Sequence, residues 1–149
     1  MGVATILLVE DDPNDVELTL SALAENGLTK IVVVRDGEEA LDYLYRRGVY
    51  ESRAAGNPAV TLLDLKLPKV DGLEVLKRIK NEPNLETIPV VMLTSSGEDQ
   101  DLLRSYSSGA NAYVIKPVGF RDFVEAVREV GLFWAIINEP PPGCVGQRN

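Results

Sequence analysis

The sequence contains no histidine and a single cysteine, Cys144, among its 149 residues. The lack of histidine excludes Ser/His and Cys/His nucleophilic pairs, imidazole metal ligands and a phosphohistidine formed on this chain. A single cysteine excludes an internal disulfide and a thiolate metal cluster, which is typical of a protein of the reducing cytoplasm. Any chemistry must therefore use carboxylates, hydroxyl groups and lysine.

Basic residues are outnumbered, with 15 Lys and Arg against 23 Asp and Glu and a net charge of −8. This balance opposes binding to a nucleic-acid backbone or an anionic membrane surface. No apolar run approaches the roughly 20 residues of a membrane span, and the N-terminal residues lack a signal-peptide pattern. We therefore expect a cytoplasmic, single-domain protein with neither nucleic acid nor membrane as a direct partner.

Apolar runs recur along the chain without the polar alternation of half-exposed strands, which predicts buried parallel strands. They are Thr5–Val9, Ile31–Val34, Val60–Leu63, Val90–Leu93 and Ala112–Ile115. Helical patterns lie between them and stop at Gly27, Gly48, Pro83 and Gly109. Alternating strands and helices with right-handed crossovers predict a doubly wound α/β fold, with a five-stranded parallel sheet and five helices.

Polar residues follow four of these strands. They are Glu10-Asp11-Asp12, Asp64, Thr94-Ser95-Ser96 and Lys116-Pro117. Separately, each has a structural explanation: Asp12 before Pro13 is a good helix N-cap, and Asp64 is a suitable residue to begin a turn. The carboxyl ends of parallel strands meet at one sheet edge, however, so these groups are expected to converge.

Convergence has chemical consequences, because neighbouring carboxylates raise one another's pKa unless a cation is held among them. Oxygen ligands without histidine or cysteine favour a hard ion, Mg²⁺ first. An amine and a hydroxyl beside that ion would bind the remaining oxygens of a phosphoryl group.

These motifs resemble those of the response-regulator receiver domain, the family of the chemotaxis regulator, over about residues 5–130. The resemblance rests on the paired acids, the string from Asp64 through Leu67-Pro68 to Asp71-Gly72, Thr94-Ser95 and Lys116-Pro117. It implies a flavodoxin-like strand order of 2-1-3-4-5. Residues 1–137 would then form the receiver domain with an extended last helix, and residues 138–149 a proline-containing tail.

The resemblance also implies a role for each site residue. Asp64 would be the phosphoacceptor, and Asp11, Asp12, Asp64 and the backbone carbonyl of Lys66 would hold Mg²⁺. Thr94 and Lys116 would contact the phosphoryl group, Thr94 and Tyr113 would form the switch pair, and Lys116-Pro117 would be a cis peptide. The side chain of Lys66 could overhang the site, which leaves the lifetime of the phosphorylated state open.

The implied function is a signalling switch rather than an ordinary enzyme: Asp64 takes a phosphoryl group from a sensor histidine kinase and catalyses its own phosphorylation and dephosphorylation. Two alternatives fit less well. A haloacid-dehalogenase phosphatase would have a second aspartate where Lys66 stands, and a flavodoxin-like cofactor carrier would have a phosphate-binding loop where Glu10-Asp11-Asp12 would repel phosphate.

The segment 48–58 and the C-terminal residues resemble single-domain regulators that serve bacterial phytochromes and related kinases. A histidine phosphotransfer protein is a further expected partner. The last predicted helix carries an apolar stripe and then a run, 130–137, that is apolar on every side. One core cannot cover all of these faces, so we expect a homodimer through this helix.

Overall fold

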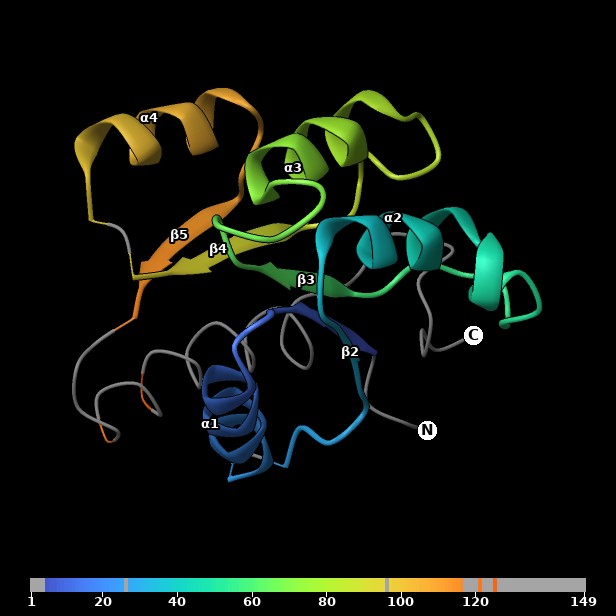
Figure 1. The fold of residues 1–149 in the computed structure, drawn as a ribbon, viewed down its shortest axis with the longest axis horizontal. Helices are drawn as coiled ribbons and strands as arrows, with labels where there is room; N and C mark the ends of the chain where they lie inside the picture. The colour runs from blue at the N-terminus through green and yellow to red at the C-terminus, as the bar shows by residue number, and fades with distance from the viewer. Residues whose placement is uncertain (1–4, 26, 96, 117–120, 122–124, 126–149) are drawn as a thin grey trace.

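The computed structural model describes residues 5–25, 27–95, 97–116, 121 and 125 (Figure 1). Its elements are β1 (Ile6–Val9), α1 (Pro13–Ala24), β2 (Ile31–Val34), α2 (Gly37–Tyr45), the 3₁₀ helix η1 (Gly48–Tyr50), β3 (Val60–Leu63), α3 (Gly72–Asn81), β4 (Val90–Thr94), α4 (Asp99–Ser107) and β5 (Ala112–Ile115). The predicted fifth helix lies almost entirely outside the described residues, as does the 138–149 tail. Within the described part, no helix is long and apolar enough to cross a membrane.

The five strands form one parallel sheet in the order β2-β1-β3-β4-β5, as the resemblance implied. Figure 1 shows α1 on one face of the sheet and α2, α3 and α4 on the other. Val9 is level with Leu63 across β1 and β3, and Leu63 is level with Met92 of β4. The strands therefore end side by side, and the residues that follow them share one edge of the sheet.

The core has two layers because successive strand residues point to opposite faces of the sheet. Leu7 and Val9 of β1 pack in the layer under α2 and α3, whereas Ile6 and Leu8 pack in the layer under α1. All four are at most 1% exposed. Each such side chain contributes about 1.5–3 kcal/mol by burial, so the sheet edge rests on a well-fixed scaffold.

The loop after β3 passes so close to neighbouring backbone that two positions require glycine. A Cβ on Gly72 would lie 2.1 Å from the carbonyl oxygen of Asp64, and one on Gly37 would lie 1.9 Å from that of Val70. The N–H of Gly72 also donates to the Leu65 carbonyl at 2.9 Å. These contacts fix the course of the chain directly after Asp64.

The segment 48–58 is a packed surface excursion and not an extension of α2, which ends at Tyr45 with Arg46 at φ 57°. The Tyr50 hydroxyl donates to Glu39 at 2.6 Å. The Arg53 guanidinium lies 4.1 Å from the centre of the Tyr43 ring and donates to its backbone carbonyl at 2.7 Å. These contacts hold the segment against α2.

Lys80 is a structural lysine at the opposite edge of the sheet. Its ammonium donates to the backbone carbonyl of Ile88 at 2.7 Å, to that of Glu86 at 3.2 Å and to Asn111 Oδ1 at 3.2 Å. We expect Lys80→Met to lower the free energy of unfolding by about 1–3 kcal/mol, because these acceptors lose a charged donor. Urea unfolding measures this, with Lys77→Met on the exposed face of α3 as the control; equal losses in both variants would contradict it.

Candidate functional site

Backbone pairing continues one residue past three of the strands and fixes the polar edge. The N–H of Glu10 donates to Val34 at 3.0 Å, and that of Asp64 donates to Val9 at 3.0 Å. On the other side of the sheet, the N–H of Lys116 donates to the Thr94 carbonyl at 2.7 Å. Glu10, Asp64 and Lys116 are therefore placed by the sheet itself rather than by loops.

Three carboxylates meet at this edge. One oxygen each from Glu10, Asp11 and Asp64 lies within 4.8 Å of the others. Glu10 is buried at 1% exposure, the Asp64 side chain is 12% exposed, and Asp11 is exposed. The structure thus brings Glu10, Asp11 and Asp64 together at the expected edge, although the family resemblance had implied no metal role for Glu10.

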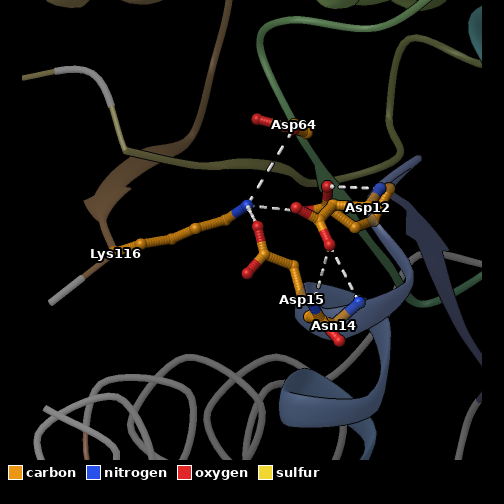
Figure 2. Close-up of polar contacts among 6 residues, drawn as sticks. Asp12, Asn14, Asp15, Asp64 and Lys116 are labelled. Atoms are coloured by element: carbon orange, nitrogen blue, oxygen red, sulfur yellow. Dashed lines mark hydrogen bonds and ion pairs between the residues drawn. The ribbon is translucent and has the colours of Figure 1, made fainter. Parts of the chain in front are cut away.

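Asp12 is not part of this group, although the resemblance had implied that it is a metal ligand. Its carboxylate accepts the N–H groups of Asn14 at 2.8 Å and Asp15 at 3.4 Å, which makes it the N-cap of α1 (Figure 2). Pro13 occupies the first helical position beside this cap. Among the acids after β1, Glu10 and Asp11 therefore lie close to Asp64, and Asp12 caps α1.

Lys116 extends from the end of β5 into the carboxylates, as Figure 2 shows. Its Nζ donates to Glu10 Oε1 at 2.6 Å and to Asp15 Oδ2 at 2.9 Å, and it lies 3.9 Å from Asp64 Oδ2. Burial alone would lower the pKa of Lys116, but the contacts with these carboxylates outweigh burial and raise it. Lys116 is therefore a fixed positive charge, and its contact with Asp15 was not foreseen.

Burial and crowding raise the pKa values of two of these carboxyl groups. Burial, together with the charge of Asp64, raises the pKa of Glu10 to about 7 despite its bond to Lys116. Burial also raises the pKa of Asp64, an effect that Lys116 and a hydrogen bond with Thr94 partly offset. A divalent cation among Glu10, Asp11 and Asp64 would offset the repulsion between these carboxylates. An all-oxygen donor set suits a hard ion such as Mg²⁺.

The remaining predicted site residues lie around this group. Thr94 is the last residue of β4, is 2% exposed and contacts Asp64. Tyr113 pairs with Met92 in the sheet and packs, partly buried, against the core layer under α2 and α3. Lys66 and Asp11 line a common cleft of about 610 Å³ that extends toward α4. Pro117, and with it the predicted cis peptide, lies outside the described residues.

Comparison with known proteins identifies the family. The model of the response regulator receiver domain matches residues 6–128. The probable methanogenesis regulatory protein FilR2 of Methanothrix harundinacea is 45% identical over 137 residues, which are 91% of this chain and 86% of that protein. The response regulator Rcp1 of Synechocystis is 39% identical over 130 residues, which are 87% of each protein.

Two solved structures share the fold closely. The phosphorylated cyanobacterial phytochrome response regulator RcpA superposes with a TM-score of 0.87 at 38% identity, over 94% of this chain and 99% of that one. The Mn²⁺-bound form of Rcp1 gives a TM-score of 0.85 at 37% identity, over 93% and 99% of the two chains. The chain therefore belongs to the response regulator receiver domain family, the phosphoacceptor proteins of two-component signalling systems.

Proposed function

We propose that Asp64 is the residue that accepts the phosphoryl group. An Asp64 carboxylate oxygen attacks the phosphorus of a kinase phosphohistidine, so that an O–P bond forms while the P–N bond breaks and the imidazole leaves with a proton. The convergence of Asp64 with Glu10, Asp11 and Lys116 at one sheet edge carries this proposal. The donor is another protein or a small phosphodonor, because this chain has no histidine.

Glu10, Asp11 and Asp64 are the residues that would hold Mg²⁺, with the Lys66 backbone carbonyl as a further ligand suggested by the family resemblance. Glu10 replaces Asp12 in this proposal, because the Asp12 carboxylate caps α1. When bound, the ion neutralises charge on the transferring phosphoryl oxygens and on the attacking carboxylate. The Mn²⁺ in a relative's structure supports a divalent metal in this family.

Lys116 and Thr94 are proposed to bind the phosphoryl oxygens left free. Lys116 is a buried ammonium within 3.9 Å of the Asp64 carboxylate, and Thr94 is a hydroxyl that contacts the same carboxylate. Together they provide a positive charge and a hydrogen-bond donor on the side of Asp64 toward β4 and β5. These same residues would assist hydrolysis, so the chain would catalyse both its phosphorylation and its dephosphorylation.

The phosphorylated state is proposed to change the surface made by α4 and β5. Movement of Thr94 toward the phosphoryl group would allow Tyr113 to turn inward, because the two residues lie on neighbouring strands. Three apolar side chains of this region are markedly exposed: Leu103 at 65%, Tyr106 at 47% and Ile115 at 47%. A beryllofluoride complex that left the surroundings of Tyr113 unchanged would count against this coupling.

For the partner we propose a sensor histidine kinase of the phytochrome type, supported by the similarity to RcpA. A histidine phosphotransfer protein would serve equally as a second acceptor in a relay. The homodimer predicted for the last helix rests on residues outside the described part of the chain, so it stays a prediction from the sequence.

Metal dependence gives the first test of the proposed function. Incubation with acetyl phosphate and Mg²⁺ should add one phosphoryl group, seen by intact mass, and EDTA should reduce the rate by at least about 100-fold. Readdition of Mg²⁺ in excess of the chelator should restore the rate, which is the control. Equal labelling with and without EDTA would show that the carboxylate group holds no functional metal.

A further inference from the structure

Asp15 is the one carboxylate bonded to Lys116 in the described structure for which neither metal binding nor phosphoryl transfer provides a role. It stands in the first turn of α1, three residues after the N-cap, and its Oδ2 accepts from Lys116 Nζ at 2.9 Å. Figure 2 shows its side chain extending from the helix toward the ammonium of Lys116. The contact joins residues 101 positions apart along the chain.

The helix does not need this side chain. Asp12 caps α1 and accepts the N–H of Asp15 itself, so the carboxylate of Asp15 is not required for capping. Asp15 is also absent from the group formed by Glu10, Asp11 and Asp64. Its charge is stabilised by the N-terminal end of the helix and by water, since 34% of the side chain is exposed. The carboxylate of Asp15 is therefore needed neither to cap the helix nor to complete the proposed metal group.

We propose that Asp15 is a positioning residue that competes with the phosphoryl group for Lys116 and so weakens and shortens the phosphorylated state. The proposal rests on the proposed function of Asp64. An ammonium has three N–H donors, and Lys116 directs two of them to Glu10 and Asp15. The distance of 3.9 Å to Asp64 is too long for a hydrogen bond, so in the unphosphorylated protein Lys116 is held beside its eventual partner.

Metal binding would affect the two carboxylates that bond to Lys116 differently. Glu10 belongs to the proposed metal ligands, so its charge is shared when the site is filled. Asp15 lies outside that group, so metal binding does not draw its carboxylate away from Lys116. The Lys116 side chain is only 10% exposed and that of Asp15 is 34% exposed, so solvent screens their attraction only in part. Phosphoryl oxygens must therefore displace Asp15 to bond fully to Lys116.

The test compares Asp15→Asn with Glu17→Gln, which removes the same charge from an exposed position two residues further along α1. With Mg²⁺ saturating, Asp15→Asn should bind beryllofluoride about three- to tenfold more tightly than wild type and should lengthen the acyl-phosphate lifetime by a similar factor. Glu17→Gln should match wild type in both. Asp15→Glu, which restores the charge, should return both values toward wild type.

A second measurement needs neither metal nor phosphoryl group. In metal-free protein, Asp15→Asn should lower the free energy of unfolding only while Lys116 is present. Urea unfolding of Asp15→Asn, of Lys116→Met and of the double variant should therefore reveal a coupling of about three- to tenfold in the unfolding equilibrium constant. If Lys116→Met does not fold, the rescue by Asp15→Glu decides. No coupling and no difference between Asp15→Asn and Glu17→Gln would overturn the proposal.

Weaker beryllofluoride binding by Asp15→Asn would also overturn it, because that result would mean that Asp15 presents Lys116 to the phosphoryl group. Failure of the proposed function looks different. In that case wild type itself would show no Mg²⁺-dependent beryllofluoride binding and no labelling by acetyl phosphate, whereas the coupling between Asp15 and Lys116 in metal-free protein would persist.

Discussion

Asp64→Asn is expected to abolish phosphorylation while the protein stays folded. An amide oxygen is a far weaker nucleophile than a carboxylate, so incorporation from acetyl phosphate should fall by at least about 1,000-fold. The fold should persist because Asn has the same shape and the backbone N–H of residue 64 still pairs with Val9. The variant should be at least as resistant to urea as wild type in metal-free buffer, since a buried charge beside Glu10 is removed.

Asp71→Asn is the matched control. Asp71 lies in the same loop, lines the cleft with Asp11 and precedes α3 without a side-chain cap, so its charge is near the site but outside the carboxylate group. Its labelling should stay within about threefold of wild type, because Asp71 is exposed and solvent and salt screen its charge. Persistent labelling of Asp64→Asn at the wild-type rate would refute the assignment.

The second large effect separates Glu10 from Asp12. Glu10→Gln removes a proposed metal ligand and should lower Mg²⁺-dependent labelling by about 10- to 100-fold. Asp12→Ala removes the N-cap of α1 and should cost about 1 kcal/mol of stability, with labelling close to wild type under folding conditions. Labelling rates and urea midpoints of both variants measure this. Loss of labelling in Asp12→Ala, with Glu10→Gln unaffected, would restore the ligand set implied by the family resemblance.

Glu10→Gln also tests the raised pKa of Glu10, through the pH dependence of stability. The pKa of Glu10 is about 7 in the folded protein, above its ordinary value of 4.5, so the folded state binds this proton more tightly than the unfolded state does. Stability contributed by the proton is therefore present at low pH and is lost as pH rises from about 4.5 to about 7. In metal-free protein this decline should flatten in Glu10→Gln.

The strands and the convergence of the site could be predicted from the sequence because buried parallel strands have unbroken apolar runs. Val60–Leu63 delivers Asp64 to the sheet edge, and the register of β1 with β3 sets its neighbours. The helices α1 to α4 were also predicted, from their apolar spacing and from the glycines or, for α3, the proline that follow them. The pattern in α4 did not reveal burial, however: Leu103 and Tyr106 are exposed and Ser105 is the buried residue, because this helix covers the edge of the sheet.

The choice among three consecutive acids could not be made from motif spacing alone. It depends on where β1 stops, and the bond from the Glu10 N–H to Val34 extends the strand's pairing by one residue. That places Glu10 level with Asp64 and leaves Asp12 at the helix start, where Pro13 had already indicated a cap. The contact of Lys116 with Asp15 joins the residue after β5 to the first turn of α1, 101 positions apart along the chain, and no local pattern encodes it.

Locating the phosphoryl group chemically tests the central claim most directly. Wild-type protein is labelled with acetyl phosphate and Mg²⁺, and borohydride then reduces the acyl phosphate to an alcohol, which converts the modified aspartate to homoserine before peptide mass analysis. The structure predicts homoserine at position 64 and at no other acid of the site. Homoserine at position 11 or 12, or an unmodified Asp64 in fully labelled protein, would contradict the account.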